Sequence, residues 1–160
     1  MSLVNEKGQA MVEFALSALV LFMLLFAIID LGMMFYVNLT LQHAVRVGTR
    51  NAIIGQSAKN GKTLREALRD DIVAASNGLC IASNIVSGPT VSILTPSATA
   101  FSNYTGSPVN DTGAPDQIII VRMKYAWPLL TPVLVPFFPP GGKYTFTASA
   151  TMKNEPGGLK

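Results

Sequence analysis

The stretch that decides the fold is KGQAMVEFALSALVLFMLLFAIIDLGMMFY, residues 7–36. Between residues 14 and 36 the only charged residue is Asp30. A helix of that length measures about 35 Å at 1.5 Å per residue, which is enough to cross a hydrocarbon core of about 30 Å. A cleavable secretory signal explains the stretch less well, because such signals have shorter apolar runs followed by a small-residue cleavage site. We therefore expect a helix that stays in the protein and crosses the lipid bilayer.

The helix is expected to continue beyond the membrane surface, because no proline follows until Pro89. Apolar and small residues recur at helical spacing on one face, namely Val37, Leu41, Ala44, Val45, Gly48 and Ala52. A polar stripe elsewhere on the helix comprises His43, Arg46 and Arg50. One helix over residues 9–54 is therefore predicted, apolar all round in its first half and amphipathic in its second. The small residues Ala44, Gly48 and Ala52 predict a face on which a small domain docks.

A second, shorter helix has explicit end signals. Thr63 and Glu66 match the spacing of a capping box, and Asn77-Gly78 is a typical stop signal. The inner face of this helix is expected to comprise Leu64, Leu68, Ile72 and Ala75.

The hydrophobic period then changes to two, which indicates strands. Residues 90–94 form a short candidate strand, and residues 117–127 and 143–153 form stronger ones. The predicted inward residues of the last two are Val121, Met123, Tyr125, Trp127, Tyr144, Phe146, Ala148, Ala150 and Met152. The predicted fold class is α+β: a long N-terminal transmembrane and amphipathic helix packs against a small domain with one short helix and an antiparallel sheet of about three strands.

Composition argues against several classes of function. The net charge of +3 is scattered along the chain, so no nucleic-acid-binding surface is expected. The one histidine, His43, has no neighbouring nucleophile pattern, and there is no phosphate-binding glycine loop. We therefore predict no enzyme, no cofactor and no small-molecule substrate. In the polar loop at residues 97–116, Asp111 and Asp116 lack the regular spacing of oxygen ligands, so no metal site is predicted.

The proline-rich stretch at residues 128–142 carries more apolar side chains than a loop needs, including Phe137 and Phe138. Two interpretations are open. The stretch either folds back over the open face of the sheet, or it forms an exposed patch that docks a partner subunit.

The residues G-QAMVE-F, from Gly8 to Phe14, resemble the cleavage and assembly signature of type IV pilin-like proteins. That resemblance implies that a prepilin peptidase cuts after Gly8 and that Glu13 is the fifth residue of the mature chain. Cleavage would create an ammonium group at Gln9, and a carboxylate one turn along the helix would neutralise it. The simpler alternative is that Glu13 merely reaches the membrane edge.

The chain resembles more closely the TadE-like family of tight-adherence pseudopilins. The matching segments are GQAMVEFAL, IIDLG around Asp30, and AVRVGTRNA, while the C-terminal YTFTASATMKNEP matches more loosely. The resemblance implies a minor pseudopilin or prepilin, a structural or assembly subunit of a type IV-like pilus. Its partners would be the prepilin peptidase, other pilins or pseudopilins, the pilus assembly platform and the lipid bilayer. Glu13, Phe14 and Asp30 are its candidate membrane and assembly residues, and Asp30 either marks the outer membrane edge or pairs with a partner subunit.

This reading divides the chain into a leader at residues 1–8, a transmembrane half-helix at 9–36 and an extracytoplasmic domain at 37–160. The expected location is the bacterial inner membrane, with a periplasmic or extracellular C-terminal domain that can enter the pilus. Arg46 and Arg50 favour the opposite orientation by the positive-inside rule. Cleavage of the leader on the cytoplasmic side favours a cytoplasmic N-terminus, which we expect. The alternative function is an uncleaved, membrane-anchored extracytoplasmic binding module.

Overall fold

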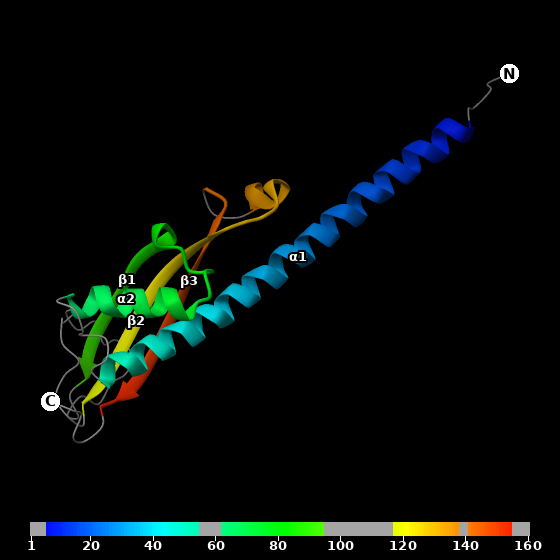
Figure 1. Ribbon diagram of the computed structural model, residues 1–160. Coiled ribbons are helices and arrows are strands. Elements are labelled where there is room, and N and C mark those ends of the chain that lie inside the picture. The colour runs from blue at the N-terminus through cyan, green and yellow to red at the C-terminus, as the bar shows by residue number, and fades with distance from the viewer. Residues whose placement is uncertain (1–5, 55–61, 95–116, 138–140, 155–160) are drawn as a thin grey trace.

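The computed structural model describes residues 6–54, 62–94, 117–137 and 141–154. Helix α1 (Glu6–Ile53) is one continuous helix of 48 residues, or about 72 Å. Figure 1 shows that its N-terminal half projects away from the rest of the protein, while its C-terminal half lies along a small domain. The predicted long helix is therefore confirmed.

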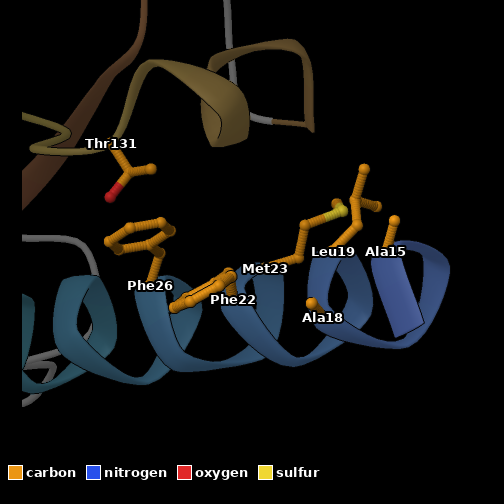
Figure 2. Close-up of a pocket in the computed structure, with 7 residues that line it drawn as sticks. All are labelled: Ala15, Ala18, Leu19, Phe22, Met23, Phe26 and Thr131. Carbon is orange, nitrogen blue, oxygen red and sulfur yellow. The ribbon is translucent and has the colours of Figure 1, made fainter. Parts of the chain in front are cut away.

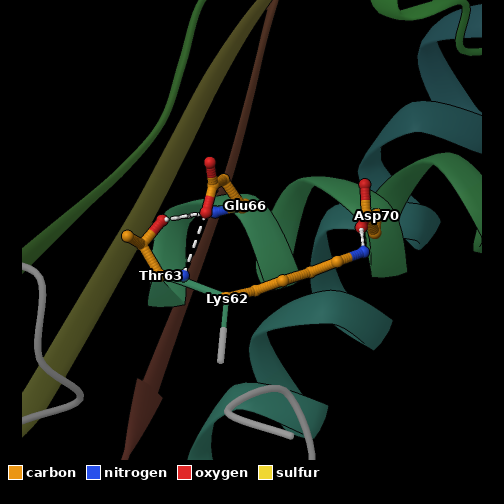
Figure 3. A network of polar contacts seen from close by, with 4 residues as sticks. All are labelled: Lys62, Thr63, Glu66 and Asp70. Atoms are coloured by element: carbon orange, nitrogen blue, oxygen red, sulfur yellow. Dashed lines mark hydrogen bonds and ion pairs between the residues drawn. The ribbon is translucent and has the colours of Figure 1, made fainter. Parts of the chain in front are cut away.

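Helix α2 (Leu64–Ala75) begins with the predicted capping box. The Glu66 amide donates to the Thr63 hydroxyl at 3.3 Å, and the Thr63 amide donates back to the Glu66 carboxylate at 3.0 Å (Figure 3). The bond from the Thr63 amide, together with a bond of 2.8 Å from the Thr63 hydroxyl to the same carboxylate, lowers the pKa of Glu66. Beside the cap, Lys62 pairs with Asp70, and the hydrogen bond to that carboxylate raises the pKa of Lys62. The pair is solvent-exposed, so its contribution to stability is small.

The helix ends where the sequence predicts. Asn77 and Gly78 have positive φ angles of 51° and 83°, a conformation that ends helices and that glycine and asparagine tolerate. A 3₁₀ turn, η1 (Ala82–Asn84), then leads into the sheet.

The sheet consists of β1 (Ile85–Leu94), β2 (Ile118–Pro128) and β3 (Lys143–Lys153), antiparallel in the order β1-β2-β3. Strand β1 begins five residues before the predicted strand at residue 90. Its pairing with β2 shifts register between Ser87 and Thr90. A β-bulge at Gly88-Pro89 on this edge strand accounts for the difference, because a Gly-Pro pair in a sequence indicates a turn.

Gly88 is required in that bulge. Its φ is 103°, and an added Cβ would lie 2.7 Å from the Arg122 carbonyl oxygen. Any other residue would therefore strain the backbone and push the two strands apart.

One face of the sheet packs against α1 and α2, and the other is mostly polar. The core combines three groups of residues: Val37, Leu41, Ala44, Val45 and Ala52 from α1, Leu68 and Ile72 from α2, and Val91, Ile119, Val121, Met123, Tyr125, Phe146, Ala148 and Ala150 from the sheet. The exposed face carries Arg122, Lys124, Thr145, Thr147, Ser149 and Thr151. This two-layer α+β arrangement confirms the predicted fold class.

Three predicted inward residues are less buried than expected, and one of them, Trp127, is half-buried. Met152 is half-buried, and Tyr144 is 39% exposed although its ring packs edge-on against Phe146 at 4.8 Å. Tyr144 pairs with Trp127 near the end of the sheet where β2 ends and β3 begins. That position, rather than the strand period, sets its exposure.

Tyr125 carries the main polar contact of the core. Its hydroxyl donates to the Leu79 carbonyl at 2.8 Å and accepts from the Ile81 amide at 3.2 Å, so it ties the segment after α2 to the middle of the fold. Cys80 lies next to this contact, and burial raises the pKa of its thiol, opposed by the charge of Arg69.

Candidate functional site

The N-terminal half of α1 is a large apolar surface that the other described residues leave uncovered. It is the one described helix that is long and apolar enough to cross a membrane, and no residue of its most apolar window is buried. Met11, Phe14, Leu21 and Ile28 are each more than half exposed. In water this surface would drive association or membrane insertion, and its length fits a bilayer. The length and composition of the half-helix therefore fit a membrane anchor.

Glu13 lies near the start of this apolar surface and is exposed. It forms no hydrogen bond or ion pair with any residue that the structure describes. Gln9 is also exposed and lies four residues earlier, so both side chains share one face of α1. Gly8 is in the first helical turn, where backbone amides have no partners within the helix. The geometry thus brings Gly8, Gln9 and Glu13 together at a helix end, with a carboxylate available to a partner.

Asp30 has a role that the sequence did not indicate. It is only 3% exposed. Its two carboxylate oxygens accept hydrogen bonds from the backbone amides of Leu130, at 3.1 Å, and Thr131, at 3.2 Å. The carboxylate therefore fastens the segment after β2 to α1, across a separation of 100 residues or more.

The proline-rich segment consequently lies beside α1 rather than over the open face of the sheet. It includes the 3₁₀ helix η2 (Pro132–Phe137), which extends past the end of the sheet towards the N-terminal half of α1 (Figure 1). The first of the two interpretations of this stretch is therefore wrong for its described part. The side chain of Phe137 and all of Phe138 lie outside what the structure describes, so their assignment as a partner patch stays a prediction.

An apolar groove of about 450 Å³ lies between α1 and this segment (Figure 2). Phe22, Phe26 and Asp30 follow one another at four-residue spacing, so the groove continues the helix face that carries Asp30. Its described lining consists of Ala15, Ala18, Leu19, Phe22, Met23, Phe26 and Thr131. Figure 2 shows Thr131 opposite the ring of Phe26.

A second hollow, of about 300 Å³, lies between α2 and β1 and is lined in part by Arg65 and Arg69. Both guanidinium groups already donate to backbone carbonyls, Arg65 to Pro89 at 3.0 Å and Arg69 to Ala82 at 3.4 Å. These arginines hold the start of the sheet against α2. No group of three or more His, Cys, Asp or Glu that could hold a metal occurs among the described residues.

The predicted docking face of α1 lies inside the protein. Ala44 and Ala52 are buried in the core, and Gly48 meets α2 directly. A Cβ at Gly48 would lie 2.8 Å from Cγ1 of Ile72 and 3.3 Å from Cδ1 of Leu68. In this structure the face serves packing within the subunit.

An Asp30→Ala variant is expected to release the segment at residues 129–131 from α1. The amides of Leu130 and Thr131 would lose their acceptors, and each unpaired buried donor costs about 1–3 kcal/mol. Amide hydrogen exchange at these two residues should therefore accelerate roughly tenfold or more. Asp30→Asn, which keeps one acceptor oxygen, should give an intermediate rate.

Asp70→Ala is the matched control, because it removes an exposed carboxylate that pairs only with Lys62 among the described contacts. Exchange at Leu130 and Thr131 that is equally slow in Asp30→Ala and Asp70→Ala would show that Asp30 does not hold the segment.

These features define a class of protein: its long helix is exposed, and long and apolar enough to cross a membrane, in one half, and it is the spine of a small α+β domain in the other. Residues 8–50, about a quarter of the chain, match the family model described as TadE-like protein. The resemblance seen in the sequence is thereby confirmed over this segment. Comparisons with curated proteins and with solved structures gave no significant match.

Proposed function

We propose that the chain is a minor pseudopilin, a structural or assembly subunit of the tight-adherence pilus that a prepilin peptidase processes after Gly8. The observation that carries the proposal is the exposed carboxylate of Glu13, without a described partner, near the start of an exposed apolar half-helix. The match to the TadE-like family model at residues 8–50 supports the same proposal.

In this proposal Glu13 neutralises the positive charge at the N-terminus that cleavage creates. Cleavage after Gly8 leaves an ammonium group on Gln9, roughly 6 Å along the helix axis from Glu13. A charged side chain at the centre of a bilayer costs about 2.5–3.5 kcal/mol on insertion scales. The ammonium group and the carboxylate offset one another, within one subunit or between neighbours. A subunit whose Glu13 lacks a partner is therefore biased towards assembly.

The position of Gly8 fits a protease site. A peptidase must bind its substrate in an extended conformation, and the first turn of a helix is its least stable part. Gly8 lies in that turn, and glycine adds no side chain that would stabilise the helix. Residues 1–8 are in this proposal a leader, residues 9–36 the membrane half-helix, and residues 37–160 the extracytoplasmic domain.

The proposed partners follow from these parts. The peptidase acts on the leader from the cytoplasmic side. The exposed half-helix contacts lipid before assembly and other pilins or pseudopilins afterwards, at the pilus assembly platform. Function lies in these contacts, and the proposal includes no catalytic group.

The test is the intact mass of the protein purified from its native membrane. We expect a chain that starts at Gln9, without residues 1–8. Gly8→Ala should slow or abolish processing, because the added methyl group occupies the cleavage position. Gly32→Ala is the matched control, since a Cβ there meets no atom within 4 Å and the change is also glycine to alanine in α1. A native mass that includes residues 1–8 would favour the uncleaved anchored binding module instead.

A further inference from the structure

The end of the sheet nearest to the N-terminal half of α1 carries residues typical of a membrane surface. Trp127, the only tryptophan of the chain, pairs with Tyr144 across β2 and β3. The next pair is Pro128 with Lys143, and Lys143 is exposed. Tryptophan and tyrosine are enriched at membrane–water interfaces, and lysine reaches lipid headgroups from that level. The domain thus faces the bilayer with this end of the sheet.

The segment that follows extends deeper along the anchor. Asp30 lies about 25 Å along α1 from Glu13, which places it near the far boundary of a hydrocarbon core of about 30 Å. The groove beneath Thr131 includes Phe26 and Phe22, which lie roughly 6 and 12 Å closer to the middle of the bilayer than Asp30. Thr131 and η2 are therefore at the level of the membrane interface or below it.

The backbone of this segment suits a site with little water. Pro128 and Pro132 have no amide proton. Between them, the Leu129 amide donates to the Gly142 carbonyl at 2.9 Å, and the Leu130 and Thr131 amides donate to Asp30. Residues 128–132 therefore present no unpaired backbone donor. Unpaired donors cost several kcal/mol in hydrocarbon, and this constraint excludes most irregular backbone from membranes.

The side chains point to the same environment. No charged residue occurs between Pro128 and Gly142. Leu130 is 54% exposed and Val135 is 37% exposed. The described lining of the groove below is apolar except for Thr131. An uncharged, proline-rich segment with outward apolar side chains is expensive to hold in water and favourable at a lipid surface.

We propose that residues 128–137 form a membrane-docking wedge: the segment inserts into the leaflet on the side of the sheet domain, and phospholipid acyl chains fill the groove between it and α1. Lipid is the occupant because the groove continues the surface of the membrane anchor without a polar break. The wedge fixes the depth and tilt of the domain relative to the bilayer. The proposal requires that α1 spans the membrane, but it does not depend on cleavage at Gly8 or on a role in a pilus.

The experiment places single tryptophans in the full chain and reconstitutes it in phosphatidylcholine vesicles, in parallel samples whose phospholipids are brominated either near the headgroup end or near the methyl end of their acyl chains. In a Trp127→Phe background, the test reporters are Val135→Trp on the wedge and Phe22→Trp in the groove. Leu24→Trp is the positive control, since Leu24 is exposed on the opposite side of α1. Thr151→Trp is the negative control, on the exposed face of β3 far from the wedge.

Both test reporters are expected to be quenched at least threefold more strongly than Thr151→Trp and to approach Leu24→Trp. Leu130→Trp replaces Val135→Trp if circular dichroism shows that the latter disturbs the fold, because Val135 packs closely on Gly142. Wedge reporters that are quenched no more than Thr151→Trp, while Leu24→Trp is quenched, would place the segment in water and overturn the proposal. A shielded Phe22→Trp would overturn it too, because it would show a protein segment in the groove instead of lipid.

Discussion

A Glu13→Ala subunit is expected to be processed and inserted normally but to disappear from assembled pili. The variant removes the one carboxylate near the new N-terminus at Gln9, so the ammonium group must enter a subunit interface in hydrocarbon without a partner. A charge costs at most about 2.5–3.5 kcal/mol in the bilayer, the value at its centre, and every 1.4 kcal/mol is a factor of ten, so incorporation should fall by up to about a hundredfold. The measurement compares the variant in sheared pili and in the membrane fraction by immunoblotting.

Two further substitutions separate charge from shape. Glu13→Gln keeps the size of the side chain but removes its charge, so it should assemble nearly as poorly as Glu13→Ala. Ser17→Ala changes an exposed side chain one turn further along α1 and should assemble as the native chain does. Native-level incorporation of Glu13→Ala would mean that Glu13 only reaches the membrane edge and contributes nothing to assembly.

A comparison of Glu13→Ala in the native and the Gly8→Ala backgrounds tests the pairing between Glu13 and the new N-terminus. If Glu13 acts by neutralising the ammonium group on Gln9, it matters only in a chain that has been cut. In the membrane fraction, the Glu13→Ala substitution should therefore reduce crosslinking between subunits whose chains have been processed. The same substitution should have little effect in the Gly8→Ala background, where that ammonium group is not formed.

Much of the fold could be predicted because its patterns are local. The helix face from Val37 to Ala52 has a clear period, the capping box at Thr63 and Glu66 is a spacing rule, and β3 alternates strictly between inward and outward residues. Each of these signals lies within one element, and the structure confirms the helix face, the capping box and the middle of β3. The alternation predicted the burial of strand residues wrongly only near the ends of the strands, as at Tyr144. Exposure there depends on how far the covering helices extend.

The contacts that could not be predicted join distant parts of the chain. Asp30 and Leu130 are 100 residues apart. Nothing near Asp30 in the sequence indicates that its carboxylate oxygens accept hydrogen bonds from backbone amides. The first half of β1 was missed because Gly88-Pro89 resembles a turn in the sequence. In the structure this pair forms a bulge, and β1 continues to pair with β2 on both sides of it. A partial signal did exist: an uncharged proline-rich stretch must find acceptors for its remaining amides, and Asp30 is the one charged residue between residues 14 and 36.

Gly48→Leu is expected to force α1 and α2 apart and to cost about 3 kcal/mol of folding free energy. Even a Cβ at this position would lie 2.8 Å from Ile72 Cγ1, and overpacking a dense core costs about 1–3 kcal/mol, at times more. The measurement is equilibrium unfolding in urea of the full chain in detergent micelles, followed by the accessibility of the buried Cys80 thiol. Gly32→Leu, where an added Cβ meets no atom within 4 Å, should leave the unfolding midpoint nearly unchanged.

A double-mutant cycle tests whether this close contact is the cause. Ile72→Ala alone should cost about 2–5 kcal/mol, because it opens a cavity beneath α1. In the double variant the leucine at position 48 can occupy that cavity, so the combined cost should fall short of the sum by about 1–3 kcal/mol, within the range measured for residues in contact. Strictly additive costs would show that Gly48 and Ile72 do not limit each other. The small residue at Gly48 would then have to serve a contact outside the subunit rather than the packing of α2.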